Sequence, residues 1–124
     1  MMAVRSPQEL IELYWDEVWN KGNVELIREL CADPIVRHDP GKVTLLSHDQ
    51  QIERVRGTVE KIKPQFTHEI LTADDRHVTS VWNMTAQSEK VPFMCGIETF
   101  RAKDGRFTDC WNPPYGYALW GEVE

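Results

Sequence analysis

The sequence lacks an excess of basic residues, a long apolar run, and any linker or internal repeat. Its 124 residues include 20 acidic and 14 basic side chains, which gives a formal net charge of −6. Because a nucleic-acid partner requires a basic face, we expect none. No apolar stretch approaches the length of a membrane span, and residues 1–7 lack the apolar run of a signal peptide. We therefore expect one domain with no membrane partner.

Closely spaced metal ligands are also missing. Cys31, Cys95 and Cys110 are odd in number and far apart, which fits neither a disulfide framework nor a zinc site. The four histidines are equally scattered, whereas a metal site needs a convergent set. We expect reduced thiols in a cytoplasmic protein, with neither a metal nor another cofactor.

What the first half of the chain does contain is strong helix signals. Ser6 and Glu9 form a capping box at the start of one helix, and Lys21-Gly22 ends it. Asn23 is expected to cap a short second helix that stops near Asp33-Pro34. Ser47 and Gln50 form a second capping box at the start of a third helix, which ends at Pro64.

The second half changes to the two-residue period of β-strands. Strands are predicted at 66–72, 77–87, 91–102 and 106–112, after a short strand at 35–38 that ends in a turn. Asp104-Gly105 is a hairpin turn signal. Helices followed by an antiparallel meander define an α+β fold, here three N-terminal helices packed on a strongly curved antiparallel sheet.

The last hairpin predicts which residues share a face. With Asp104-Gly105 as a two-residue turn, Phe100 lies opposite Asp109 and Glu98 opposite Trp111. Alternation then places Glu98, Phe100, Phe107, Asp109 and Trp111 on the inner face, and Thr99, Arg101, Thr108, Cys110 and Asn112 on the outer face. A buried carboxylate is costly unless it is partnered or protonated, so two of them indicate chemistry rather than packing.

Three segments resemble a known family. They are YWDEVWNKGN at 14–23, VRHDPG at 36–41 and GIETFR at 96–101. In this order they resemble the SnoaL-like polyketide cyclase family of the nuclear-transport-factor-like superfamily. The resemblance implies a single domain over residues 1–124, a cone-shaped α+β barrel, and a homodimer formed through the outer sheet face.

Ketosteroid isomerases share that fold and give a sharper comparison. Asp39-Pro40 matches the position of their general base, and Glu98-x-Phe-Arg matches the acid that donates to the oxyanion. Their active-site tyrosine corresponds to Trp15 here, with Tyr14 one residue away. The resemblance therefore implies that Asp39 and Glu98 are catalytic.

Each candidate also has a purely structural interpretation. Asp39 is suited to a turn, and Glu98 could instead form a salt bridge at the rim of the barrel. Asp109 is either a pocket acid or base or the partner of a helix residue such as Arg56. Only one of His38 and Asp39 need point inward, and a structural role is favoured for His38. The residues that we expect to contact a bound molecule are Tyr14, Trp15, Trp19, His38, Trp82, Phe100 and Trp111.

The leading hypothesis is a small cofactor-independent isomerase, cyclase or dehydratase acting on an apolar carbonyl-bearing or polyketide-like molecule. Asp39 or Asp109 would remove a proton, and a neutral Glu98 would donate to the oxyanion. The alternative is a non-catalytic binding or scaffold protein. Epoxide hydrolysis ranks low because Arg101 is on the outer face. The aromatic tail at 112–120 is expected to be structural or, second, to cap the pocket.

Overall fold

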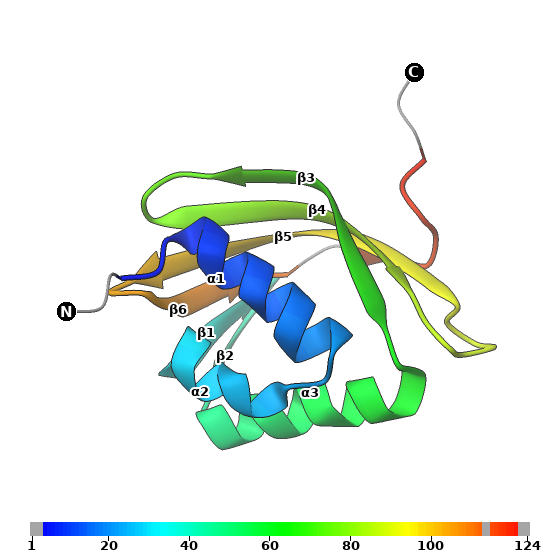
Figure 1. The fold of residues 1–124 in the computed structure, drawn as a ribbon, viewed down its shortest axis with the longest axis horizontal. Helices are drawn as coiled ribbons and strands as arrows, with labels where there is room; N and C mark the ends of the chain where they lie inside the picture. The colour runs from blue at the N-terminus through cyan, green and yellow to red at the C-terminus, as the bar shows by residue number, and fades with distance from the viewer. Residues whose placement is uncertain (1–3, 113–114, 122–124) are drawn as a thin grey trace.

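The computed structural model describes residues 4–112 and 115–121, and within them it confirms the α+β fold class. Figure 1 shows α1 lying against a strongly curved sheet, with α3 at the other end of the sheet's concave side. The elements in chain order are α1 (Pro7–Leu13), a π-helical stretch (Tyr14–Asn20), a 3-10 turn (Val24–Leu26), α2 (Ile27–Leu30), β1 (Cys31–Asp39), β2 (Lys42–Leu46), α3 (His48–Ile62), β3 (Gln65–Ala73), β4 (His77–Thr85), β5 (Phe93–Lys103), β6 (Arg106–Trp111) and β7 (Tyr115–Gly116).

The helix starts are those that the sequence predicts. The Ser6 hydroxyl accepts from the Glu9 backbone N–H at 3.2 Å, and the Ser6 N–H donates back to the Glu9 carboxylate. Ser47 and Gln50 repeat this arrangement at the start of α3. Asn23 makes no side-chain cap, and a 3-10 turn follows it, so the prediction of a capped second helix is wrong at that residue.

The first helix widens instead of ending after α1. Residues 14–20 are π-helical, and their buried side chains include Tyr14, Trp15, Val18 and Trp19. Because a π-helical turn holds more residues than an α-helical turn, bulky neighbours can share one buried face, and such stretches are frequent at functional sites. This segment supplies three aromatic rings to the concave side of the sheet.

The sheet has the strand order β2-β1-β6-β5-β4-β3, and β7 pairs with β5. All pairs are antiparallel except β1 and β6, which run parallel. No local pattern indicates that parallel pair, because it joins residues such as Arg37 and Cys110, which are 73 positions apart. Strand β2 was also missed; it is an edge strand whose Val43 and Leu45 are exposed.

A β-bulge changes the predicted hairpin. Lys103 pairs with Arg106 and Ala102 with Phe107, as expected, but Arg101 then pairs with Asp109 and Phe100 with Cys110. The extra residue in β6 is Thr108. A bulge shifts the alternation of faces by one residue, so everything after it lies on the face opposite to the predicted one.

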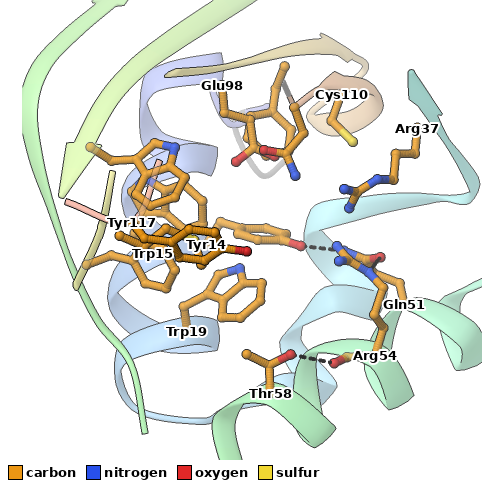
Figure 2. Close-up of a pocket in the computed structure, with 15 residues that line it drawn as sticks. Tyr14, Trp15, Trp19, Arg37, Gln51, Arg54, Thr58, Glu98, Cys110 and Tyr117 are labelled. Atoms are coloured by element: carbon orange, nitrogen blue, oxygen red, sulfur yellow. Dashed lines mark hydrogen bonds between the residues drawn. The ribbon is translucent and has the colours of Figure 1, made fainter. Parts of the chain in front are cut away.

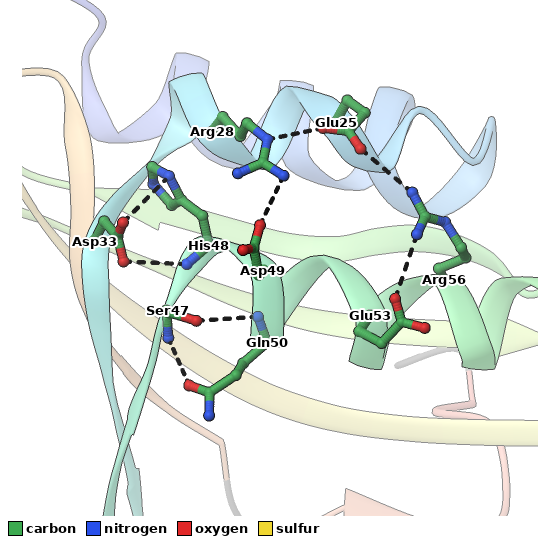
Figure 3. A network of polar contacts seen from close by, with 9 residues as sticks. All are labelled: Glu25, Arg28, Asp33, Ser47, His48, Asp49, Gln50, Glu53 and Arg56. Atoms are coloured by element: carbon green, nitrogen blue, oxygen red, sulfur yellow. Dashed lines mark hydrogen bonds and ion pairs between the residues drawn. The ribbon is translucent and has the colours of Figure 1, made fainter.

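Surface ion pairs join α3 to the preceding helix (Figure 3). Arg28 Nη2 lies 2.8 Å from Asp49 Oδ1, and Arg56 Nη2 lies 3.3 Å from Glu25 Oε1. Exposed pairs of this kind contribute little to stability. The side chains that α3 buries are Gln51, Ile52 and Val55.

The core lies between the first helix and the concave face of the sheet. Trp15 stacks on Phe66 with ring centroids 4.8 Å apart, and Phe100 stacks on Phe107 at 4.3 Å. Cys31, Cys95 and Cys110 are buried and unpaired, as predicted. Within the described part of the chain, no helix is long and apolar enough to cross a membrane.

Candidate functional site

A cavity of about 250 Å³ opens between the first helix, α3 and the concave face of the sheet. Figure 2 shows that its two sides differ in chemistry, with Trp15 and Trp19 on one side and Arg37, Gln51 and Arg54 on the other. The aromatic lining residues are Tyr14, Trp15, Trp19, Phe66, Trp82, Phe100 and Tyr117; the polar ones are Arg37, Gln51, Arg54, Thr58, Glu98 and Asn112, and Met94 and Cys110 complete the wall.

Glu98 is the one carboxyl group among the described residues that line this cavity. It lies in the middle of β5 and is only 8% exposed. Burial raises its pKa to about 7, although the charges of Arg54 and Arg37 partly oppose this. A carboxyl group with that pKa exchanges protons readily near neutral pH, which is the property required of a general acid or base.

Arg37 reaches the cavity from β1, and Asp39 holds it from outside. Arg37 Nε donates to Asp39 Oδ2 at 3.1 Å, and Nη2 lies 3.5 Å from Oδ1. The two residues share a strand face because they are two positions apart. Asp39 is not part of the cavity wall. It therefore orients Arg37, whose guanidinium points into the cavity in Figure 2.

A second polar unit comes from α3. Gln51 is buried, and its Nε2 donates to the Tyr14 hydroxyl oxygen at 2.6 Å. The Gln51 carbonyl oxygen accepts from Arg54 Nε at 3.4 Å. Burial raises the pKa of Tyr14 well above its usual value, so its hydroxyl stays protonated. Since that oxygen accepts from Gln51, the phenolic proton is free to be donated elsewhere.

Three buried N–H groups on the cavity wall have no partner among the described residues. They belong to Trp19, Trp82 and Nη1 of Arg37. Leaving such a donor buried and unpaired costs about 1–3 kcal/mol. A ligand with acceptor oxygens that reached these donors would offset this cost.

Three predicted site residues lie on the outer face instead. His38 stacks on Trp111 with centroids 4.5 Å apart, and its Nε2 lies 2.9 Å from Asp109 Oδ2. Arg101 approaches the same carboxylate at 3.7 Å. Although partial burial raises the pKa of Asp109, hydrogen bonds with His38 and Thr108 outweigh it and lower the pKa overall. The inward placement of Asp109 and Trp111 is wrong because the bulge reverses their direction.

Most of the other predicted site residues line the cavity. Of the expected contact residues, Tyr14, Trp15, Trp19, Trp82 and Phe100 line the cavity together with Glu98. Trp15, which we expect from the sequence to correspond to the tyrosine of ketosteroid isomerases, donates its indole N–H to Ser80 Oγ at 3.4 Å. Asp39 contacts Arg37 and is not part of the cavity wall, and His38 packs on the outer face of the sheet.

The polar wall is what the sequence reasoning missed. A signal was present on α3, where Gln51, Arg54 and Thr58 follow one another at spacings of three and four residues. A helix whose apolar stripe borders such a polar stripe can face a polar cavity. On β1, Arg37 was overlooked because Asp39, on the same strand face, was assigned the catalytic role.

The aromatic tail is both anchored and close to the cavity. Asn83 accepts from the Trp120 backbone N–H at 2.7 Å, and the Trp120 indole donates to the Gly96 carbonyl at 3.3 Å. Tyr117 lines the cavity. The described part of the tail is therefore held against the sheet, with Tyr117 beside the cavity; Pro113 and Pro114 lie outside the described residues.

Metal and thiol chemistry have little support in this wall. Among the described residues, no group of three His, Cys, Asp or Glu side chains converges on one point. Cys110 faces the cavity, but burial and, secondarily, the charge of Glu98 raise the pKa of its thiol to about 12. It therefore stays in its weakly nucleophilic thiol form near neutral pH.

Comparison with solved structures identifies the same fold in other proteins. One, from Acidithiobacillus ferrooxidans and proposed to be a polyketide cyclase, has a TM-score of 0.75 and 26% identity over 91% of this chain and 90% of that chain. A SnoaL-like polyketide cyclase from Agrobacterium tumefaciens has a TM-score of 0.71 and 12% identity, covering 89% and 91%. An LEH-like epoxide hydrolase from M. tuberculosis has a TM-score of 0.69 and 12% identity, covering 83% and 77%.

At identities as low as those of the second and third structures, the likeness concerns the fold alone. No sequence among the curated proteins matches this chain. The sequence profile described as a SnoaL-like domain matches residues 11–110, which is most of the chain. This protein therefore belongs to the SnoaL-like domain family.

Proposed function

We propose that this protein is a cofactor-independent enzyme that moves a proton next to the carbonyl group of a small ring compound, with Glu98 as both acid and base. The observation that carries the proposal is the Glu98 carboxyl group, which is buried in an aromatic cavity and has a pKa of about 7. Near neutral pH, Glu98 is then ionised, and so a base, in about half of the molecules, and protonated, and so an acid, in the other half. One residue can therefore accept a proton and return it.

The lining residues supply the remaining parts of such a reaction. Ionised Glu98 takes a proton from the carbon beside the carbonyl, and the carbonyl oxygen becomes an enolate. Tyr14 and Arg37 Nη1 are the donors that would bind the enolate oxygen. When this enolate is conjugated with a carbon–carbon double bond, protonated Glu98 returns the proton to the far carbon of the conjugated system, which is isomerisation. In ring closure, the enolate carbon attacks a second carbonyl, and Glu98 protonates the new alkoxide.

This assignment differs from the expectation drawn from ketosteroid isomerases. Asp39 is engaged by Arg37, and Asp109 lies on the outer face with His38. Neither lines the cavity. Glu98 therefore takes the base's role that the sequence assigned to one of them, and Asp39 acts as a positioning residue for Arg37.

The substitution Glu98→Gln tests the proposal. The probe is 2-tetralone in D₂O, whose activated carbon exchanges hydrogen for deuterium when a base removes a proton; NMR follows the loss of the proton signal. We expect Glu98→Gln to slow the protein-catalysed exchange by about a hundredfold or more, the usual contribution of a positioned general base. Asp109→Asn, on the outer face, is the matched control and should exchange at the wild-type rate.

Two outcomes would count against an enzyme. Equal exchange rates for wild type and Glu98→Gln would show that Glu98 is not the base. Tight binding of ring ketones with no exchange above the rate without protein would favour the alternative, a non-catalytic binding protein of the same fold.

We also propose that two copies associate through the outer sheet face. The row Ile70, Val81 and Ile97 crosses three paired strands there, and Ile70 and Ile97 are exposed. Exposed apolar side chains that line up on one face favour an interface. Sedimentation at micromolar concentration should give twice the 14.4 kDa chain mass, and Ile97→Lys should reduce it toward one chain. A monomeric wild type would refute this proposal.

A further inference from the structure

We infer that the cavity selects a small, flat ring compound that carries a carboxylate, and that Arg37 and Arg54 bind this carboxylate. The inference rests on the proposed function, since it names the substrate class of the same site. The first support is the division of the cavity in Figure 2, where Arg37 and Arg54 face Trp15 and Trp19 across the open space. A ligand that fits both sides has an apolar ring at one end and a polar group at the other.

Arg54 provides the unsatisfied charge. Among the residues that the structure describes, no carboxylate lies within ion-pair distance of it, and Gln51 alone accepts a hydrogen bond from it. Other arginines on the neighbouring surface are paired; Arg56, two residues later, contacts both Glu25 and Glu53. Arg54 is exposed and lines the cavity, so its guanidinium meets both solvent and the open space without a carboxylate partner among the described residues.

Arg37 provides a directed donor. Its pairing with Asp39 uses Nε and Nη2 and leaves Nη1 buried without a partner in the described structure. A guanidinium held on one edge by a carboxylate presents its remaining N–H groups in a fixed direction. This fixed geometry suits a planar carboxylate better than a freely rotating group would.

The hydrogen-bonding capacity of the wall is unbalanced in the same sense. Among the described lining residues, the fully buried side-chain atoms without a partner are all donors, namely Arg37 Nη1 and the indole N–H groups of Trp19 and Trp82. The Gln51 amide already uses its nitrogen for Tyr14 and its oxygen for Arg54. An ionised carboxylate only accepts hydrogen bonds, so it complements these donors without adding another donor that would lack an acceptor.

The charge balance around Glu98 also fits. Asp39 compensates Arg37, which leaves Arg54 and Glu98. When Glu98 is protonated, the cavity has one positive charge in excess, and a ligand carboxylate neutralises it. Both arginines act electrostatically on Glu98, so the bound carboxylate lies close enough to keep the reacting carbon near that residue.

The apolar end of the ligand is defined by size and shape. The cavity volume of about 250 Å³ is at the small end of ligand sites, which suits one or two rings. Trp15 already stacks on Phe66, so a flat ring can extend this parallel arrangement.

Isothermal titration with a matched pair of probes tests the inference. 2-Naphthoate and 2-naphthamide share one ring system, but only the first carries a carboxylate. At a pH near 6, where Glu98 is mostly protonated, we expect the naphthoate to bind at least tenfold more tightly to the wild type.

Three variants distinguish the loss of the Arg54 charge from a loss of folding. Arg54→Gln should weaken naphthoate binding tenfold or more and leave naphthamide binding unchanged. Arg54→Lys should retain most of the naphthoate affinity because it keeps the charge. Arg56→Gln makes the same change on the outer side of the same helix, and it should bind both probes as the wild type does.

The contrary results are equally distinct. Equal affinity of the wild type for the two probes, or a parallel loss of both in Arg54→Gln, would overturn the carboxylate site. If tetralone exchange still depends on Glu98 in that case, the proposed function survives without it. Selective naphthoate binding with no Glu98-dependent exchange would support the carboxylate site and refute the enzyme.

Discussion

Replacement of Phe100 by alanine is expected to destabilise the protein by about 3–5 kcal/mol, the usual cost of removing a fully buried ring. Phe100 is only 1% exposed. Its ring centroid lies 4.3 Å from that of Phe107, on which it stacks, and 5.6 Å from that of Tyr14. The loss is a large part of the stability of a typical small domain. The same change enlarges the cavity beside Glu98 and admits water there, so the pKa of Glu98 should fall toward its ordinary value.

Urea denaturation of the Phe100→Ala variant measures the first effect, and NMR titration of the Glu98 side-chain carbon measures the second. Phe93→Ala is the matched control, because Phe93 lies on the same strand but is 45% exposed. It should cost less than about 1 kcal/mol. A Phe100→Ala protein as stable as the control would show that the ring is not part of the core.

Replacement of Glu98 by glutamine is expected to remove most of the pH dependence of stability between about pH 4.5 and pH 7. Burial raises the pKa of Glu98 from 4.5 to about 7, so the folded protein holds this proton more tightly than the unfolded chain. Stability from this group is fully present below pH 4.5, falls as the pH rises, and is lost above about pH 7. The shift corresponds to roughly 3 kcal/mol.

Chemical denaturation of both proteins at several pH values checks this expectation. The wild type should lose roughly 3 kcal/mol of unfolding free energy over this range beyond any loss in Glu98→Gln. Glu60→Gln, an exposed position on α3, should follow the wild type. Parallel pH profiles for wild type and Glu98→Gln would show that Glu98 has an ordinary pKa. Together with the exchange assay, this tests whether the group that limits stability is the group that catalyses.

Local signals predicted the helix starts and the last turn. Ser6 and Ser47 begin helices because their capping boxes satisfy free N–H groups at the first turn, a requirement set by a few neighbouring residues. Asp104 and Gly105 form the predicted turn with φ values of 54° and 77°. The parallel pairing of β1 with β6 and the bulge at Thr108 depend on contacts between distant segments, which no local pattern contains.

The candidate site was predicted only in part, because some of its residues also depend on contacts between distant segments. Glu98 and Phe100 lie before the turn, in the strand whose alternation is regular, and both were placed on the correct face. Asp109 and Trp111 follow the bulge and were placed on the wrong one. Arg54 was missed because an exposed arginine on an amphipathic helix normally only faces solvent; Arg54 is exposed here too, and the position of α3 places it at the edge of the cavity.

The bulge at Thr108 has a consequence for how members of this family can diverge. It places the Cys110 thiol in the cavity and the Asp109 carboxylate outside, although the two residues are adjacent. Insertion of a single residue between the bulge and Asp109 would shift the later residues by one position and bring the carboxylate inward opposite Phe100. One insertion could therefore exchange a thiol for a second acid, with no point substitution in the wall itself. Relatives of similar sequence can for this reason differ in chemistry through strand length alone.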